Sequence, residues 1–297
     1  MNIVILSRNQ GLYSTQSLAR AARLRHHYVR IIDYVNCDLV INEGILNINY
    51  HGQVLKDIDA IIPRIGASWT SYGAAVIRQF EYLKIFSTLR SEALIKARNK
   101  LICSQILASH GIHLPKSIVS NNSYAYSALL NEFEGDKVVI KLINSTHGVG
   151  VLLANKGIQA ENILEAFTRS NQKSMIQEYI AESKGADIRI FIVDDEIVGC
   201  MKRQAQSGEF RSNLHRGGSS TVEEITEEEA AIAIRAVQIL GLKVAGVDML
   251  RSNRGPLVLE VNASPGLEGI ESTTGNDIAG RIINFIERNI QTEDSTL

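Results

Sequence analysis

The 297-residue chain is short of cysteine, of net charge and of long apolar runs. It has three cysteines, Cys37, Cys103 and Cys200, which are far apart and form no Cys-x-x-Cys pair. An odd number of scattered thiols excludes a cysteine-based zinc site and is typical of a protein in the reducing cytoplasm. The sequence therefore predicts thiols that pack as small core side chains.

Net charge is nearly absent. The formal charge of -1 and the pI near 6.7 provide no basic field that could hold a nucleic acid, so any anionic partner must be held locally. The apolar segment that follows Met1 is too short for a signal peptide, and no other run approaches the length of a membrane span. We expect a cytoplasmic protein that binds neither membranes nor nucleic acids directly.

Length and a hydrophobic content of 45% predict two or three units, each with its own core. The first unit, residues 1–95, begins with a strand–helix–strand pattern and is predicted to be a small α/β domain with a parallel sheet. Its predicted elements are strands at 3–6, 29–33 and 60–63, a hairpin at 45–55, and helices at 14–25, 72–86 and 91–109.

Two α+β lobes are predicted to follow, at residues 96–182 and 183–290, and residues 291–297 are expected to be a frayed tail. The middle lobe has strands predicted at 116–119, 138–143, 151–154 and 175–179. One helix is predicted at 123–133, and a second follows the strand 151–154 and ends at residue 167. The last lobe has strands predicted at 187–193 and 196–203, a helix that opens at the capping box Thr226–Glu229, and a final hairpin.

That hairpin carries the most informative residues. Two β-rich runs, 244–250 and 257–261, flank the turn sequence 252–255, so Asp248 and Glu260 are expected on facing strands. Asn262 lies two residues after Glu260 and shares its face, whereas Val261 points into a core. Two carboxylates and an amide suit Mg²⁺, which prefers oxygen ligands. From these residues alone, ordinary solvated strand and turn positions are an equal alternative.

Other features suit an anionic ligand. Lys141 lies in the apolar strand 138–142, where a lysine usually has an anionic partner, and phosphate is the natural candidate. The loop 145–150, with Gly148, could bring backbone N–H groups close to phosphate oxygens, although a plain hairpin turn explains it as well.

A strand ending at Glu178 and Tyr179 beside a break in the chain could read an adenine edge, or could be an ordinary interdomain strand. Asp187 and Arg189 share a face, and Asp187 could accept a hydrogen bond from a ribose hydroxyl; a surface ion pair between the two is the alternative.

Three arginines, Arg203, Arg211 and Arg216, fall in a polar, glycine-containing segment that resembles a loop for carboxylate or phosphate groups. Solvated loop arginines are the alternative. His147 and His215 have no visible acidic partner, and no catalytic role is assigned to them.

Taken in order, these motifs resemble the ATP-grasp carboxylate–amine ligases. They run from Lys100 and Lys141 through the glycine loop, Glu178-Tyr179 and Arg211-Ser212-Asn213 to Asp248 and the segment 260–266. Segments 9–13, 61–66, 211–218 and 266–271 are similar to the RimK-type members, and the resemblance spans nearly the whole chain. It implies an ATP-grasp fold preceded by the small parallel-sheet domain. One departure is His147, where relatives carry glutamine.

The resemblance also implies roles for these residues. Those expected to bind ATP are Lys100, Lys141, Gly148, Glu178, Tyr179, Asp187, Arg211, Ser212 and Asn213. Those expected to hold two Mg²⁺ ions, which Mn²⁺ could replace, are Asp248, Glu260 and Asn262, with Glu260 as the bridge. Arg203 or Arg216 is the candidate catalytic residue that binds glutamate or stabilises the oxyanion, and Arg64 is a further candidate.

The reaction that the resemblance implies is ATP-dependent addition of free L-glutamate to the C-terminal carboxylate of a small-subunit ribosomal protein, through an acyl phosphate. Synthesis of poly-α-glutamate is left open, and a homo-oligomer is expected. Two alternatives remain: a ligase for a small amino-acid or peptide acceptor, and a non-catalytic ATP-binding regulatory protein.

Overall fold

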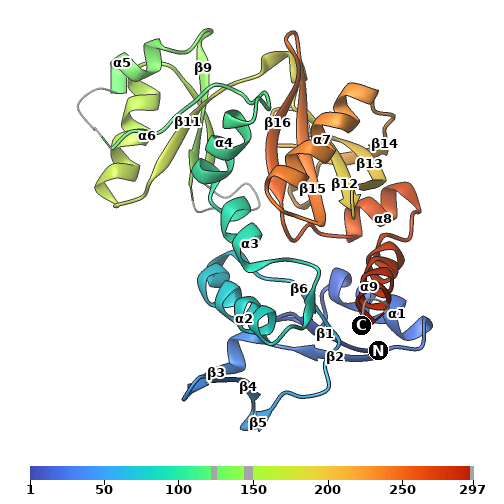
Figure 1. Cartoon of the computed structure of the whole chain (residues 1–297). Coiled ribbons are helices and arrows are strands. Elements are labelled where there is room, and N and C mark those ends of the chain that lie inside the picture. The colour runs from blue at the N-terminus through green and yellow to red at the C-terminus, as the bar shows by residue number, and fades with distance from the viewer. Residues whose placement is uncertain (122–125, 144–149, 295–297) are drawn as a thin grey trace.

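The computed structural model describes residues 1–121, 126–143 and 150–294 (Figure 1). The four sheets of this part divide among three regions: an N-terminal unit, a middle lobe and a C-terminal lobe. No helix among these residues has both the length and the apolar character needed to cross a membrane. The predicted mixture of α/β and α+β units, with a parallel sheet at the N-terminus, is confirmed.

The N-terminal unit is built on a parallel sheet with the order β2-β1-β6-β7. Its strands are β1 (Asn2–Leu6), β2 (Tyr28–Ile32), β6 (Ala60–Pro63) and β7 (Phe86–Ser87). Alternate residues of β1 enter different cores: Val4 and Leu6 face one cluster, and Ile3 and Ile5 face another. Both faces of this sheet are therefore covered, as a parallel sheet requires.

The predicted hairpin at 45–55 is part of a separate three-stranded antiparallel sheet, made of β3 (Cys37–Asn42), β4 (Ile45–Tyr50) and β5 (Gln53–Val54). The helices of this unit are α1 (Tyr13–Leu24) and α2 (Thr70–Tyr82). The prediction that a helix continues to Phe86 is wrong. The chain turns at Lys84, which has a φ of 60°, and Phe86 begins β7.

The helix predicted at 91–109 is two helices, α3 (Ser91–Arg98) and α4 (Lys100–Ser109). Asn99 separates them with an extended backbone (φ -86°, ψ 105°), and its side-chain oxygen accepts hydrogen bonds from the N–H groups of Leu101 and Ile102. The asparagine thus caps α4 and prevents a continuous helix. The predicted domain boundary at residue 95 falls within α3 and stays a prediction.

The middle lobe has its own sheet and its own core. The antiparallel sheet has the order β10-β9-β11-β8, with β8 (Ser117–Ile118), β9 (Lys137–Leu142), β10 (Val151–Asn155) and β11 (Ser174–Glu178). Helices α5 (Tyr126–Asn131) and α6 (Ile158–Arg169) pack beside it. In Figure 1 this lobe stands apart from the N-terminal unit, and α3 and α4 connect the two.

The C-terminal lobe contains a five-stranded antiparallel sheet with the order β14-β13-β12-β15-β16. Its elements are β12 (Ala186–Val193), β13 (Glu196–Gln204), β14 (Ser219–Val222), α7 (Glu227–Ile239), β15 (Val244–Ser252) and β16 (Gly255–Asn262). The predicted capping box at the start of α7 is confirmed, because Thr226 and Glu229 exchange both hydrogen bonds. The predicted boundary at 182 and 183 falls in the 3₁₀ helix η4 (Ala181–Ser183) and stays a prediction.

Two further helices, α8 (Glu268–Thr274) and α9 (Ile278–Asp294), have no counterpart in the elements predicted from sequence. Helix α9 returns to the N-terminal unit and lies beside α1, where Phe285 packs edge-on against Phe86 (Figure 1). Helix α9 extends to Asp294, and residues 295–297 lie outside the described part, so the expectation of a frayed tail from residue 291 stays a prediction. The first and last units therefore share hydrophobic cores.

The cap at Asn99 can be tested by stability. Replacing Asn99 with Ala removes the acceptor for two N–H groups and should lower the free energy of unfolding by about 1 kcal/mol. Asn99→Asp keeps the acceptor and should stay close to the parent. Urea unfolding followed by circular dichroism measures both; an alanine variant as stable as the parent would show that the cap is unimportant.

Candidate functional site

A cavity of about 650 Å³ lies where the three regions meet, and residues from all of them line it. Among the described residues, its lining has seven lysine and arginine side chains and five aspartate and glutamate side chains. Most sequence-predicted site residues reach it: Lys100, Lys141, Glu178, Tyr179, Asp187, Arg203, Arg211, Ser212, Asn213, Asp248, Glu260 and Asn262. The excess of cations suits an anionic ligand.

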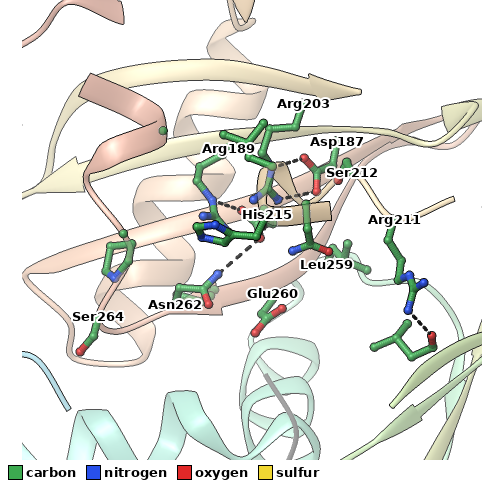
Figure 2. A pocket seen from close by; sticks show the side chains of 18 of the residues that line it. Asp187, Arg189, Arg203, Arg211, Ser212, His215, Leu259, Glu260, Asn262 and Ser264 are labelled. Atoms are coloured by element: carbon green, nitrogen blue, oxygen red, sulfur yellow. Dashed lines mark hydrogen bonds and ion pairs between the residues drawn. The ribbon is translucent and has the colours of Figure 1, made fainter. Parts of the chain in front are cut away.

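Asp248 and Glu260 are cross-strand partners in the β15–β16 ladder, as predicted. Asn262 shares the Glu260 face, and its amide donates to the Asp248 carboxylate at 3.4 Å, whereas Val261 is buried in the core (Figure 2). The register shifts just after Asp248, because Met249 pairs with Val258. The three oxygen-bearing side chains thus converge at the cavity wall.

A buried ion network holds Asp248 in place. Arg189, its partner across the β12–β15 ladder, donates from Nε and Nη2 to the two carboxylate oxygens at 2.7 and 2.6 Å. Arg203 makes the same paired contact with Asp187 across β12–β13, at 2.7 and 2.5 Å, and its Nη2 lies 3.0 Å from Asp248 (Figure 2). The ion pair considered between Asp187 and Arg189 does not form, because each pairs with a neighbouring strand.

The network keeps its members charged. Burial acts to raise the pKa of Asp248, but Arg189 and Arg203 more than offset this and hold the pKa below its usual range. Burial likewise acts to lower the pKa of Arg203, and the attraction of Asp248 and Asp187 raises it overall. Asp248 and Arg203 are therefore both charged at neutral pH.

The two predicted phosphate-binding lysines lie in a different electrostatic setting. Burial lowers the pKa of Lys141 to about 8, despite the nearby negative charge of Glu260, and burial also lowers the pKa of Lys100. Glu260 makes no hydrogen bond or ion pair with any described residue. An acid with no partner among the described residues, beside two ammonium groups whose charged form is disfavoured by burial, is an arrangement that a metal-bound polyphosphate would complete.

Glu178 and Tyr179 both line the cavity, but the Glu178 carboxylate is already engaged. It accepts from the Lys116 N–H at 3.1 Å and from Arg254 Nη2 at 2.7 Å. An adenine at this strand would therefore meet its main chain and neighbouring apolar groups rather than a free carboxylate.

The Arg211 loop is tied to the middle lobe. Arg211 pairs with Glu209 at 2.7 Å, and its Nη1 donates to the Val151 carbonyl at 3.2 Å. A Cβ on Gly218 would lie 2.8 Å from the Ser212 carbonyl oxygen, so only glycine permits this close packing of the loop. The loop thus presents Ser212 and Asn213 to the cavity.

One predicted site residue, Arg216, does not line the cavity, and another, Gly148, lies outside the described residues. Arg216 is exposed in the 3₁₀ helix η5 (Leu214–Arg216) and is absent from the cavity lining, whereas its neighbour His215 is present. The role predicted for Arg216 has no support from its position. Gly148, with most of the glycine loop including His147, lies outside the described residues.

The sequence predicted no site role for Arg98 and only a possible surface ion pair for Arg189, yet both residues line the cavity. The signal for Arg98 was its place beside Asn99, since the helix break turns both Arg98 and Lys100 toward the same space. No local signal reveals the partner of Arg189, because Asp248 lies 59 residues away.

The donor set fits a magnesium site that is completed by phosphate. The described residues contain no cluster of three His, Cys, Asp or Glu side chains that could hold a metal alone. Glu260, Asn262 and Asp248 supply two carboxylates and an amide, and Mg²⁺ commonly combines such a set with waters and nucleotide phosphates. Asp248 could serve only if one of its arginine contacts loosens, since both of its oxygens are engaged.

Comparison with known proteins agrees with this geometry. Residues 1–94 match the RimK PreATP-grasp domain, and residues 97–286 match the RimK-like ATP-grasp domain. The chain belongs to the RimK-like ATP-grasp family. Proteins named probable alpha-L-glutamate ligase from Pseudoalteromonas translucida and Vibrio cholerae are each 50% identical to it, over 97% of this chain and 96% of theirs. As a member of this family, it is an ATP-grasp ligase.

Solved structures share the fold at much lower identity. The ATP-grasp ligase PsnB, complexed with minimal precursor, Mg and ADP, has a TM-score of 0.73 and 18% identity, covering 98% of each chain. The macrocyclase MdnC, bound with precursor peptide MdnA from Microcystis aeruginosa, has a TM-score of 0.74 and 16% identity, covering 97% of this chain and all of its own. These likenesses confirm the predicted ATP-grasp fold.

Removal of one partner from the buried network should be costly, because it leaves an uncompensated buried charge. Asp187→Ala leaves Arg203 buried with one carboxylate partner fewer and should lower the free energy of unfolding by about 3 kcal/mol. The matched control Glu165→Ala removes the exposed pair with Arg169 and should change little. Chemical unfolding of both variants tests this, and equal effects would show that the network is structurally unimportant.

Proposed function

We propose that this protein is an ATP- and Mg²⁺-dependent carboxylate–amine ligase that adds L-glutamate to the C-terminal carboxylate of a small-subunit ribosomal protein. The observation that carries the proposal is the cationic cavity in which Glu260 faces Asp248 across one hairpin. The glutamate ligase names of the relatives with 50% identity support the amino-acid substrate.

In this proposal the cavity residues divide the work of binding. Lys141 and Lys100 hold the ATP phosphates, the Glu178–Tyr179 strand lies against adenine, and Asp187 with the loop 211–213 surrounds the remainder of the nucleotide. Asp248, Glu260 and Asn262 would hold up to two Mg²⁺ ions, and Glu260 is the candidate to contact both. Bound metal would neutralise phosphate charge and make the γ-phosphorus more electrophilic. Mn²⁺ could take its place.

The reaction has two steps. The acceptor carboxylate attacks the γ-phosphorus, which releases ADP and forms an acyl phosphate. The free amine of glutamate then attacks the acyl carbon, phosphate leaves, and the nitrogen loses a proton as the amide forms. Because nucleophile and nucleotide are both anionic in the first step, the cations around the cavity act mainly by positioning and charge neutralisation.

Arg203 is the better candidate for the catalytic arginine, since it lines the cavity and Arg216 does not. Its two aspartate contacts fix the guanidinium and leave it positively charged. A fixed cation of this kind could stabilise the oxyanion of the second step.

The most specific element of the proposal is that the acceptor is a peptide chain. PsnB and MdnC, which share the fold, are described in complex with precursor peptides, so this architecture admits a peptide chain. A cytoplasmic homo-oligomer that meets its acceptor at the ribosome remains part of the proposal.

The acceptor can be tested by intact mass measurement of ribosomal proteins after incubation with the enzyme, Mg²⁺, ATP and glutamate. We expect one small-subunit protein to gain mass in steps of one glutamate residue. Free amino acids and short peptides form a parallel set of acceptors. ADP release with these alone would assign a small-molecule ligase, and no release with any acceptor would point to a regulatory protein.

The bridging role of Glu260 predicts a marked mutational contrast. Glu260→Gln should lower kcat on the order of 100-fold, because one carboxylate contacting both metals would be lost. Glu165→Gln, on the exposed surface of α6, should match the parent. Phosphate release measures both, and full activity in Glu260→Gln with none in Asp248→Asn would contradict the bridging assignment.

The low pKa of Lys141 predicts a pH-dependent nucleotide affinity. The ammonium is charged below its folded-state pKa of about 8 and loses its proton as the pH rises through that value. Affinity for MgADP should therefore be full below pH 8 and fall above it by up to about tenfold per pH unit. Lys141→Arg, which stays charged, should remove this dependence in calorimetric titrations; an unchanged pH profile would exclude Lys141 as its source.

A further inference from the structure

The end of the cavity formed with the N-terminal unit contains polar groups that the nucleotide does not need. Arg64 follows β6, Arg98 ends α3, and Ser264 follows β16, and all three line the cavity. In Figure 2, Ser264 lies on the opposite side of the view from Arg211, with Glu260 and Asn262 between them. The cavity therefore has a second end beyond the candidate metal residues.

Main-chain oxygens, not acids, hold the two arginines at this end. Arg64 Nη2 donates to the Pro265 carbonyl at 2.7 Å, and Arg98 Nη2 donates to the Ile65 carbonyl. Neither guanidinium forms an ion pair with a carboxylate among the described residues. Arg98 Nε and Ser264 Oγ are buried and have no hydrogen-bond partner there. Buried polar groups of this kind are normally satisfied.

The electrostatic surroundings of the two arginines favour binding of an anion. Burial and the neighbouring charge of Arg98 lower the pKa of Arg64 to about 10. Burial also lowers the pKa of Arg98, and Glu260 offsets part of that effect, whereas Glu260 is not among the causes at Arg64. Two desolvated like charges raise the energy of the empty site, and a ligand with carboxylates would relieve this.

We infer that Arg64, Arg98 and Ser264 form the subsite for the carboxylates of a dicarboxylic amino-acid substrate. This inference rests on the proposed function and names the residues that select its substrate. The planar guanidinium matches a carboxylate with two parallel hydrogen bonds, and the lysines on the other side of Glu260 suit phosphate.

The charges of the two guanidinium groups should select L-glutamate over its amide, L-glutamine. L-Glutamine would leave one guanidinium uncompensated in a desolvated site, so it should bind far more weakly than L-glutamate. Arg98 Nε and Ser264 Oγ are buried in this arrangement, so we expect ligand binding to be accompanied by a rearrangement that brings them into contact with the ligand.

Calorimetric titration of the full-length protein, saturated with MgADP, tests the subsite with L-glutamate, L-aspartate and L-glutamine. Ser264→Ala is the sharpest variant, because it removes a hydroxyl that has no partner in the described structure. The ligand-free variant should melt no lower than the parent, while the Kd for L-glutamate rises about tenfold.

Arg98→Gln should raise the Kd for L-glutamate on the order of 100-fold, since a hydrogen-bonded charge is lost. The control Arg169→Gln, on the exposed surface of α6, should match the parent. The Kd for MgADP, measured separately, should stay within about twofold in all variants, as expected of sites that act independently.

Three binding results would overturn the inference: a parent protein that binds no dicarboxylic amino acid, variants that lose affinity for MgADP instead, or variants that weaken binding only of a peptide acceptor. Turnover measurements separate the subsite inference from the proposed function. If active variants keep the parent's KM for glutamate, the subsite inference is wrong and the proposed function still stands. If glutamate binding depends on the subsite but no acceptor receives glutamate, the subsite inference is supported and the proposed function is wrong.

Discussion

The buried network of Asp187, Arg203, Asp248 and Arg189 is the constraint on which the site depends. It spans the three central strands of the C-terminal sheet. Two of its ion pairs, Asp187–Arg203 and Arg189–Asp248, join residues directly opposite in the ladders, and Arg203 also reaches Asp248 two strands away. Desolvation makes such a network a weak source of stability compared with apolar packing. What it provides is position: Asp248 stays charged opposite Glu260, and Arg203 stays charged at the cavity wall.

Beyond this network the cavity contains cations, Lys141, Arg64 and Arg98, that form no ion pair with an acid among the described residues. Lys141 has a lowered pKa on one side of Glu260, and Arg64 with Arg98 lies toward the N-terminal unit. Hydrophobic cores shared between the first and last units fix the position of Arg64 and Arg98 relative to the C-terminal sheet. For a ligase that must bring several anions together, this arrangement prepares the charge compensation before the substrates arrive.

Local patterns predicted much of this. Turn residues and strand periodicity placed Asp248 opposite Glu260, and the capping box located the start of α7. The sequence did not reveal the break at Asn99, because a helix-compatible apolar pattern continues on both sides of it. Pairing between distant strands decides the partner of Arg189, and the tertiary position of η5 decides that His215 lines the cavity and Arg216 does not. Such non-local choices leave no trace in short-range spacing.

The central claim is that one cavity separates a phosphate end at the lysines from a carboxylate end at the arginines. A crystal structure of the protein with MgADP and L-glutamate tests it most directly. We expect the ADP phosphates beside Lys141, metal at Glu260, and the glutamate carboxylates beside Arg64 and Arg98. Phosphates bound at Arg64 and Arg98, with glutamate elsewhere, would contradict the account.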